Sequence, residues 1–173
     1  MPAMLRQLML VLLFVCTLQP AISQKKKEVQ TVKGKVVRII DGDTFELLVG
    51  RTPYRIRMNA IDAPERGQDY YQVSKQALSD QCFNKTMTVK LLKKDMYQRW
   101  LGDLYDAKGV YVNAWMVARG YAWQYKYSND ATLAAAQEAA RKKHLGLWSQ
   151  PSPQEPWTFR KVKRNGGAAL QVH

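Results

Sequence analysis

Three short segments near the start of the chain have the hydrophobic pattern of β-strands. Residues 31–40, 44–49 and 54–59 are β-branched or alternate between apolar and polar residues, and turn-forming residues at 41–42 and 50–53 separate them. In the third segment Ile56 and Met58 fall on one face and Arg57 falls on the other, since strand side chains alternate. The pattern predicts an antiparallel meander of three strands.

The rest of the chain mixes helical and strand patterns. Helical spacing of apolar residues predicts a helix over residues 68–83, and residues 87–92 and 101–105 have strand character. Asn113 is a candidate cap for a short helix that ends at Gly120. A final helix is capped by Asn129-Asp130 and stopped by Gly146, with His144 on its apolar face in a packing or capping role.

This order of elements predicts an α+β fold on a small antiparallel sheet, and strands of this length often close into a barrel. We expect a signal peptide over residues 1–23, a basic lead-in over 24–30, one folded domain over 31–149, and a tail over 150–173. The tail is rich in proline and then in basic residues, so it is predicted to be mostly disordered.

The first 23 residues combine a basic start at Arg6, a short apolar run and small residues before the predicted cleavage after Ser23. The run is shorter than the roughly 20 residues that a membrane-spanning helix needs, so we expect export without stable membrane insertion. Cleavage would also remove Cys16, and the remaining Cys82 has no partner for an internal disulfide.

The composition indicates the kind of partner. The 173 residues are 46% hydrophobic, enough for one compact core, and carry a net charge of +13, which loss of Arg6 reduces to +12. Such an excess points to a polyanion, most often a nucleic acid, although anionic lipid and polysaccharide remain open on charge alone.

Two acidic segments stand at predicted strand ends. Asp43, in Asp41-Gly42-Asp43-Thr44, and Asp62, in Asp62-Ala63-Pro64-Glu65, each have an alternative interpretation as part of an ordinary turn. Together they indicate a cation site, because adjacent strands can bring their ends within metal-bridging distance. Hard oxygen ligands without clustered His or Cys favour Ca²⁺ or Mg²⁺.

Basic groups beside these acids suggest chemistry on phosphate. The planar guanidinium of Arg57 can bind two phosphate oxygens and keeps its charge. A cation and arginines placed at a phosphodiester stabilise the charge that develops during hydrolysis, and Glu65 is available to activate or orient the attacking water. The predicted chemistry is phosphodiester hydrolysis.

Five blocks of the chain resemble the staphylococcal nuclease (thermonuclease) family over about residues 31–149. They are "IDGDTF" (40–45), "IRMNAIDAPE" (56–65), "DMYQRWLGDLY" (95–105), "VNAWMVARGYA" (112–122) and "LGLW" (145–148). The resemblance implies a five-stranded OB-fold barrel with three α-helices. It also implies a Ca²⁺-dependent nuclease that acts on DNA and RNA and leaves 3′-phosphates.

The resemblance also assigns roles to individual residues. It implies that the metal ligands are Asp43, Asp62 and the backbone carbonyl of Ala63. Arg57 and Arg99 would bind the scissile phosphate, and Glu65 would be the general base or a water-orienting group. The aromatic residues that border the nucleotide site would be Tyr97, Tyr125 and Tyr127, where bases can stack.

The chain departs from the family pattern at three positions within the matching blocks. Ala63 stands where Thr is found in the best-known member, and Met96 and Gln98 replace a Lys and a Gly. The turn at Gln98 is therefore expected to avoid a conformation that only glycine adopts easily.

We therefore expect an exported, secreted or periplasmic, monomeric nuclease with little sequence specificity. Two alternatives stay open at this point. One is a non-catalytic nucleic-acid-binding OB-fold module, and the other is a basic surface-interaction protein whose tail binds anionic lipid or a wall polymer.

Overall fold

A computed structural model describes residues 29–169, and the predicted signal peptide lies outside this range, as do residues 24–28 and 170–173. Five strands form a closed barrel in the order β1-β2-β3-β6-β5. Their bounds are β1 (Gln30–Ile39), β2 (Thr44–Val49), β3 (Thr52–Met58), β5 (Thr86–Lys94) and β6 (Trp100–Tyr105). The predicted meander and barrel are confirmed.

Neighbouring strands of the barrel are antiparallel except for β3 and β6, which run parallel with Arg57 opposite Leu101. The barrel is therefore mixed rather than purely antiparallel. Alternate residues point inward, and the centre is filled by fully buried side chains such as Val36, Phe45, Ile56 and Leu104. Closure leaves no long strand edge exposed to pairing with another chain.

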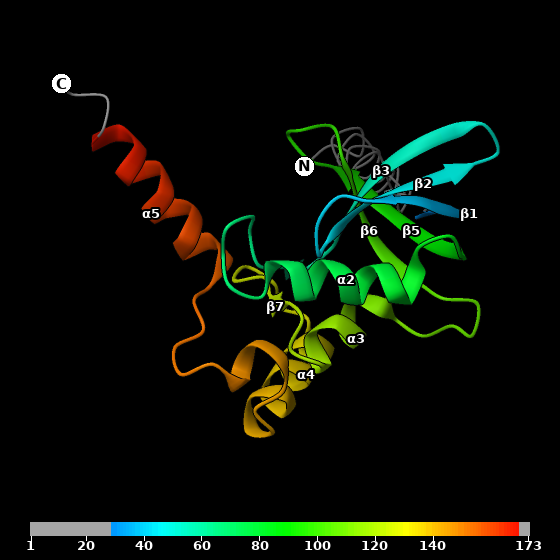
Figure 1. Cartoon of the computed structure of the whole chain (residues 1–173). Helices are drawn as coiled ribbons and strands as arrows, with labels where there is room; N and C mark the ends of the chain where they lie inside the picture. Colours follow the sequence, from blue (N-terminus) through cyan, green and yellow to red (C-terminus); the bar gives the residue numbers. More distant parts are fainter. Residues whose placement is uncertain (1–28, 170–173) are drawn as a thin grey trace, which may run out of the picture.

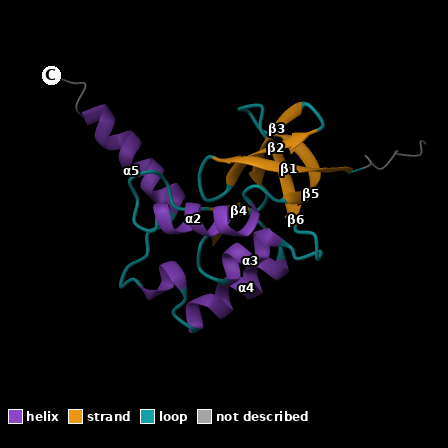
Figure 2. Cartoon of the chain, turned by 45° about the vertical axis from the view of Figure 1, so that its right-hand side comes forward, coloured by secondary structure: helices purple, strands orange, loops and turns teal. Residues whose placement is uncertain are grey.

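The helices lie mainly on one side of the barrel, as Figures 1 and 2 show. The described helices are α2 (Tyr71–Cys82), α3 (Val112–Ala118), α4 (Ala131–Lys142), the 3₁₀ helix η1 (Gly146–Ser149) and α5 (Pro156–Ala169). A second, two-stranded sheet pairs β4 (Ile61–Asp62) with β7 (Trp123–Gln124). None of the described helices has the length and apolar character to cross a membrane.

Two of the predicted helix caps differ in outcome. Asp130 caps α4 as predicted, because its carboxylate accepts hydrogen bonds from the amides of Thr132 and Leu133 at 2.8 and 3.1 Å. Asn113 is not a cap: it is fully buried inside α3, and its side chain accepts from the Leu104 amide at 3.0 Å and donates to the Asn59 carbonyl at 2.9 Å. It links α3 to β6 instead.

The prediction that His144 lies on the apolar face is wrong, but its capping role is confirmed, because its amide donates to the Arg141 carbonyl at 3.0 Å just after α4. Helix α4 ends at Lys142, and His144 is exposed in the following turn with φ of 51°. It therefore takes no part in the apolar face of α4, which is made by Leu133 and Ala140.

A disordered tail is not what the structure shows over residues 156–169, where α5 adds a fourth α-helix to the three that were expected. Proline suits the first turn of a helix, and Pro156 opens α5. The Trp157 ring then packs against Trp123 of β7 at a centroid distance of 5.9 Å, and Trp123 packs against Trp148 of η1 at 4.3 Å. This aromatic contact fixes the start of a helix that otherwise projects from the domain (Figure 1).

Candidate active site

The turn between β1 and β2 presents Asp43 to the site. The Asp43 amide donates a 3.0 Å hydrogen bond to Asp41 Oδ1, and Asp43 itself is only 5% exposed. Gly42 is needed for close approach, since a Cβ there would lie 2.0 Å from Ser74 Oγ of α2 and 2.8 Å from Ala63 Cβ. The turn is thus pressed against α2 and the β4 segment.

The strand β4 brings a second carboxylate to the first. Asp62 is 1% exposed, and the amide of the next residue, Ala63, donates to Asp43 Oδ2 at 3.1 Å. The Asp43 carbonyl accepts from the Met58 amide at 2.7 Å, which ties the turn to the end of β3. The two acidic segments therefore meet as the strand ends predict.

Arg57 joins the two carboxylates. Its Nη2 atom lies 2.8 Å from Asp62 Oδ1 and 3.2 Å from Asp43 Oδ2, and its Nη1 donates to the Ile61 carbonyl at 3.2 Å. The charges of Asp43 and then Asp62 raise the pKa of Arg57 above its ordinary value, against the opposing effect of burial. One guanidinium therefore fixes the relative position of both acids.

Glu65 follows β4 and is less buried, with a side-chain exposed fraction of 37%. Its amide donates to Gln68 Oε1 at 3.0 Å, and its carbonyl accepts from the Gln68 amide at 2.8 Å, so a tight turn before α2 orients it. Glu65 Oε1 accepts a short hydrogen bond from Arg160 Nη1 of α5. The structure thus places a partly exposed carboxylate beside Asp62.

Asp41, Asp43, Asp62 and Glu65 form an acidic cluster around Arg57, and burial raises the pKa values of two of its carboxyls. Burial, followed by the charge of Asp43, raises the pKa of Asp41 from 3.8 to about 7. Burial also raises the pKa of Asp62, even though Arg160 and Arg57 act in the opposite direction. Both carboxyls would be stabilised in their charged form by a further cation.

The donor set fits a hard divalent cation. Asp43 and Asp62 offer carboxylate oxygens on facing segments, and no His or Cys competes for a softer metal among the contacts described above. In residues 29–169 no set of three or more acidic, His or Cys side chains is arranged as a ready-made metal cage. A cation here would therefore need water, a backbone carbonyl or a substrate oxygen to complete its coordination.

Arg99 lies in the turn just before β6, the strand that pairs with β3, and is held differently. Asp95 Oδ2 accepts a 2.8 Å hydrogen bond from Arg99 Nε and lies 2.8 Å from Arg99 Nη2 in an ion pair. Arg99 comes two positions before Leu101, the residue paired with Arg57, so strand alternation places it on the same side of the sheet. No contact joins it to the acidic cluster within the described chain, so its approach to the same phosphate stays a prediction.

The turn that carries Arg99 adopts an unexpected backbone conformation. Gln98 has φ of 62°, in the left-handed region that glycine favours, so the expectation that this turn avoids such a conformation is wrong. The Asp95 carboxylate accepts from the Tyr97 and Arg99 amides at 2.9 and 3.0 Å and holds the turn in this shape. The local hydrogen bonds therefore outweigh the residue preference.

The three predicted aromatic residues lie in two places. Tyr97 is exposed on the β5–β6 turn with the Arg99 guanidinium 5.5 Å from its ring centroid. Tyr125 and Tyr127 follow β7 with their rings edge to face at 5.5 Å, and the Tyr125 amide donates to the Ala60 carbonyl near β4. Tyr97 and Tyr127 are 72% and 73% exposed, so their rings are accessible to a base.

Two residues of the cluster were not predicted. Asp41 was regarded only as part of a turn, although an Asp-x-Asp spacing was the signal for it. Arg160 falls in the tail that is predicted to be mostly disordered and has no local signal, because 98 residues separate it from the Asp62 that it contacts. The roles assigned to Ala63 and to the tyrosines remain predictions, since the contacts neither require nor oppose them.

Comparisons with known proteins agree with this arrangement. The family model for staphylococcal nuclease homologues matches residues 55–150. An uncharacterized endonuclease of Escherichia coli O157:H7 is 42% identical over 133 residues, covering 76% of this chain and 87% of the relative. A micrococcal nuclease of Shigella flexneri is 40% identical over 144 residues, covering 77% and 83%.

More distant relatives include a staphylococcal-like nuclease of Arabidopsis thaliana, which is 34% identical over 138 residues and of which this chain covers 42%. The blocks that suggested the resemblance include the two segments that carry Arg57, Asp62 and Arg99, and these fall inside the matched range. The family match over more than half of the chain, with relatives about 40% identical over most of their length, shows that the chain belongs to the staphylococcal nuclease homologue family.

Proposed function

We propose that the protein is a Ca²⁺-dependent nuclease that hydrolyses phosphodiester bonds of DNA and RNA with little sequence specificity and leaves 3′-phosphates. Family membership makes it an endonuclease and hence a phosphodiesterase. The observation that carries the finer proposal is the meeting of two buried carboxylates, Asp43 and Asp62, on one nitrogen of Arg57. Glu65 lies beside them.

In this proposal Asp43 and Asp62 hold the cation, with the Ala63 carbonyl as a candidate third ligand. The cation supplies charge stabilisation at a phosphoryl oxygen when it is bound. The preference for Ca²⁺ rests on the oxygen-only donor set and on the family resemblance.

The arginines bind the substrate phosphate. Arg57 is pre-positioned by two carboxylates and the Ile61 carbonyl, so little reorganisation is needed before a phosphate arrives. Arg99 would exchange its Asp95 partner for a phosphate oxygen. Since negative charge on the phosphoryl oxygens grows during hydrolysis, both groups stabilise the transition state more than the ground state.

We assign Glu65 to the activation or orientation of the attacking water. Its carboxylate is partly exposed, and the turn at Gln68 fixes its backbone, so it is accessible to solvent without being free to move away. It accepts or orients the proton of the attacking water. The backbone phosphates and the tyrosine faces carry most of the binding, so affinity for nucleic acid should fall steeply with salt.

Replacement Glu65→Gln tests this assignment. Turnover on DNA in Ca²⁺ should fall by a factor of about 100 or more, since general-base catalysis contributes about that much, while DNA binding is retained. Nuclease assays with Ca²⁺ and with chelator measure the first, and fluorescence anisotropy measures the second.

The matched control is Glu46→Gln, which removes a carboxylate paired with Arg55 on the barrel, away from the cluster. It should leave turnover unchanged. Near-normal turnover of Glu65→Gln would remove Glu65 from the mechanism. Activity that does not change when chelator is added would show that the mechanism needs no cation.

The two alternative functions are less well supported. A non-catalytic binding module has no need for Asp43, Asp62, Glu65 and Arg57 to be grouped as they are. A surface-interaction protein needs its basic tail free, whereas Arg160 of that tail is bound to the cluster. We also propose that the protein acts as an exported monomer, which fractionation of secreted and periplasmic material and a gel-filtration measurement would test.

A further inference from the structure

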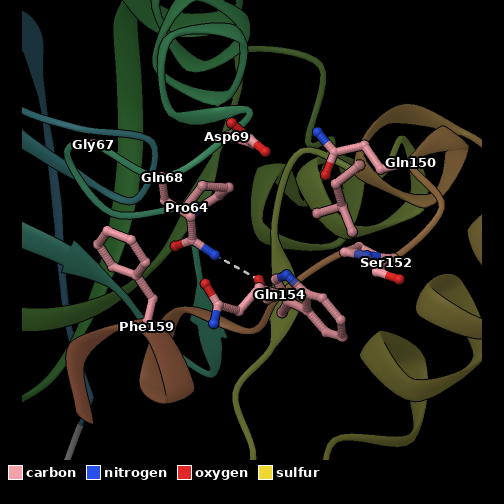
Figure 3. Close-up of a pocket in the computed structure, with 11 residues that line it drawn as sticks. Pro64, Gly67, Gln68, Asp69, Gln150, Ser152, Gln154 and Phe159 are labelled. Carbon is pink, nitrogen blue, oxygen red and sulfur yellow. Dashed lines mark hydrogen bonds between the residues drawn. The ribbon is translucent and has the colours of Figure 1, made fainter. Parts of the chain in front are cut away.

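Helix α5 begins in a fixed place beside the acidic cluster. Trp157 packs against Trp123, and the Gln154 carbonyl just before the helix accepts a 2.5 Å hydrogen bond from Gln68 Nε2 (Figure 3). Phe159 lies next to the Gly67–Gln68 turn and lines, with these segments, a cavity of about 150 Å³. The segment that enters α5 is therefore attached to the same loop that carries Glu65.

This attachment directs Arg160 into the cluster. Its Nη2 and Nη1 atoms lie 2.6 Å from Asp62 Oδ2 and 3.1 Å from Asp62 Oδ1, and Nη1 also donates to Glu65 Oε1. A planar guanidinium on both oxygens of one carboxylate is among the stronger polar contacts in proteins. The partner is a nearly fully buried carboxylate, which separates this ion pair from an ordinary surface pair.

The neighbouring basic residues of α5 behave differently. Lys161, Lys163 and Arg164 are exposed, and within the described chain their side chains make no ion pair. Among these basic residues of α5, Arg160 is therefore the one that forms ion pairs with the cluster.

Arg160 takes the lone pairs that a divalent cation would use. Asp62 Oδ2 is bound to Arg160, and Asp62 Oδ1 is shared between Arg160 and Arg57. A cation entering at Asp62 would displace this contact and would be repelled by the positive charge if Arg160 stayed. The same guanidinium also occupies an oxygen of Glu65, the residue assigned to water.

We propose that Arg160 is a built-in competitor of the divalent cation, so that docking of α5 on Asp62 and Glu65 and binding of the cation at Asp62 exclude one another. The docked form is then a resting state in which the metal ligand and the water-activating group are both covered. The coupling is reciprocal. Docking of α5 weakens cation binding at Asp62, and cation binding weakens the docking of α5 by the same factor. This inference rests on the proposed cation site.

Calcium binding to the purified protein, measured by isothermal titration calorimetry without nucleic acid, tests the inference. Arg160→Gln should bind Ca²⁺ about tenfold more tightly than the unaltered protein, because a charge-assisted contact no longer has to be broken. Arg160→Lys should fall between the two, since a lysine keeps the charge without the planar fork.

The matched control is Lys161→Gln, which removes the same charge from the next position, where the side chain is exposed. It should change the affinity by less than about twofold, as expected for a screened surface charge. An equal gain from Lys161→Gln and Arg160→Gln would reduce the effect to net charge and overturn the inference.

A second variant tests the anchor. Trp157→Ala removes the packing that holds the start of α5 and should raise the Ca²⁺ affinity in the same direction. Combined with Arg160→Gln it should add little, because both changes relieve the same contact.

The possible failures are distinguishable. If the unaltered protein binds Ca²⁺ through Asp43 and Asp62 and neither Arg160→Gln nor Trp157→Ala binds it more tightly, the inference is overturned and the proposed function stands. If neither the unaltered protein nor Arg160→Gln binds Ca²⁺, the proposed cation site and the inference both fall.

Discussion

The acidic cluster around Arg57 and the turn that carries Arg99 each hold one guanidinium, and they hold it by different means. Arg57 has an exposed side-chain fraction of 15% and binds two carboxylates, one from the turn between β1 and β2 and one from β4. Arg99 has an exposed fraction of 25% and binds Asp95, four residues earlier in its own turn. The first arrangement depends on the tertiary fold, and the second is local.

This difference separates two tasks that the same residue type performs. Arg57 neutralises buried charge, so the fold needs it whether or not a substrate is bound. Arg99 can release Asp95, which lies in a partly exposed turn where water replaces the lost contact at little cost. A phosphate-binding arginine can therefore be fixed in the buried site or be able to exchange its partner. The burial of the partner carboxylate indicates which of the two applies.

The largest effect is expected from Arg57→Gln. The change leaves Asp43 and Asp62 buried without the guanidinium that they share. Removing one partner of a buried ion pair costs about 3–5 kcal/mol. Urea denaturation in the presence of chelator measures the loss in free energy of unfolding.

The control for that change is Arg99→Gln, which should alter the free energy of unfolding by less than about 1 kcal/mol. Both variants should lose nuclease activity. Equal destabilisation by the two variants would show that the fold needs Arg57 no more than it needs Arg99.

A smaller, pH-dependent effect is expected from Asp41→Asn in chelator. The pKa of Asp41 is raised to about 7, so the folded protein keeps a proton that the unfolded chain loses near its ordinary value of 3.8. Stability from this group is full below about pH 4 and is lost as the pH rises through about 7. Asparagine has no such loss, so Asp41→Asn should be more stable than the unaltered protein at pH 8, by up to about 4 kcal/mol.

The measurement is a series of denaturation curves from pH 4 to pH 8 for both proteins. The difference in free energy of unfolding should be small at pH 4 and grow towards pH 8. A difference that is constant with pH would mean that Asp41 does not titrate in this range.

The smallest effect is expected in the Arg99 turn. Gln98→Gly removes the steric penalty of a side chain at φ of 62° and should stabilise the protein by about 0.5–1 kcal/mol, with the gain limited by the added freedom of the unfolded chain. Thermal unfolding followed by circular dichroism is sufficient to detect it. A loss of stability would mean that the Gln98 side chain makes a contact that matters more than its backbone.

The barrel was predictable because its information is local. The strand predicted over residues 44–49 has the same bounds as β2, and the capping role of Asp130 follows from its position before an apolar helical stripe. Asn113 failed the same kind of reasoning because its amide satisfies buried backbone groups of Leu104 and Asn59, which only the assembled fold brings near. The parallel pairing of β3 with β6 is likewise a property of the whole barrel.

The same division applies to the site. Asp43, Asp62 and Arg57 stand at strand ends, so pattern and chemistry together predict that they meet. Glu65 follows from its place in the loop after β4. Arg160 does not, because its position depends on the packing of Trp157 against Trp123, a contact between segments that have no common pattern in the sequence.

The three indoles that seat α5 have a practical consequence. Trp123, Trp148 and Trp157 come from β7, η1 and α5 and meet edge to face. Aromatic chromophores at such separations couple their electronic transitions, so the near-ultraviolet circular dichroism of the protein should contain a band that depends on this arrangement. The molecule thus carries its own optical signal for whether the end of the chain is seated or released, with no label attached.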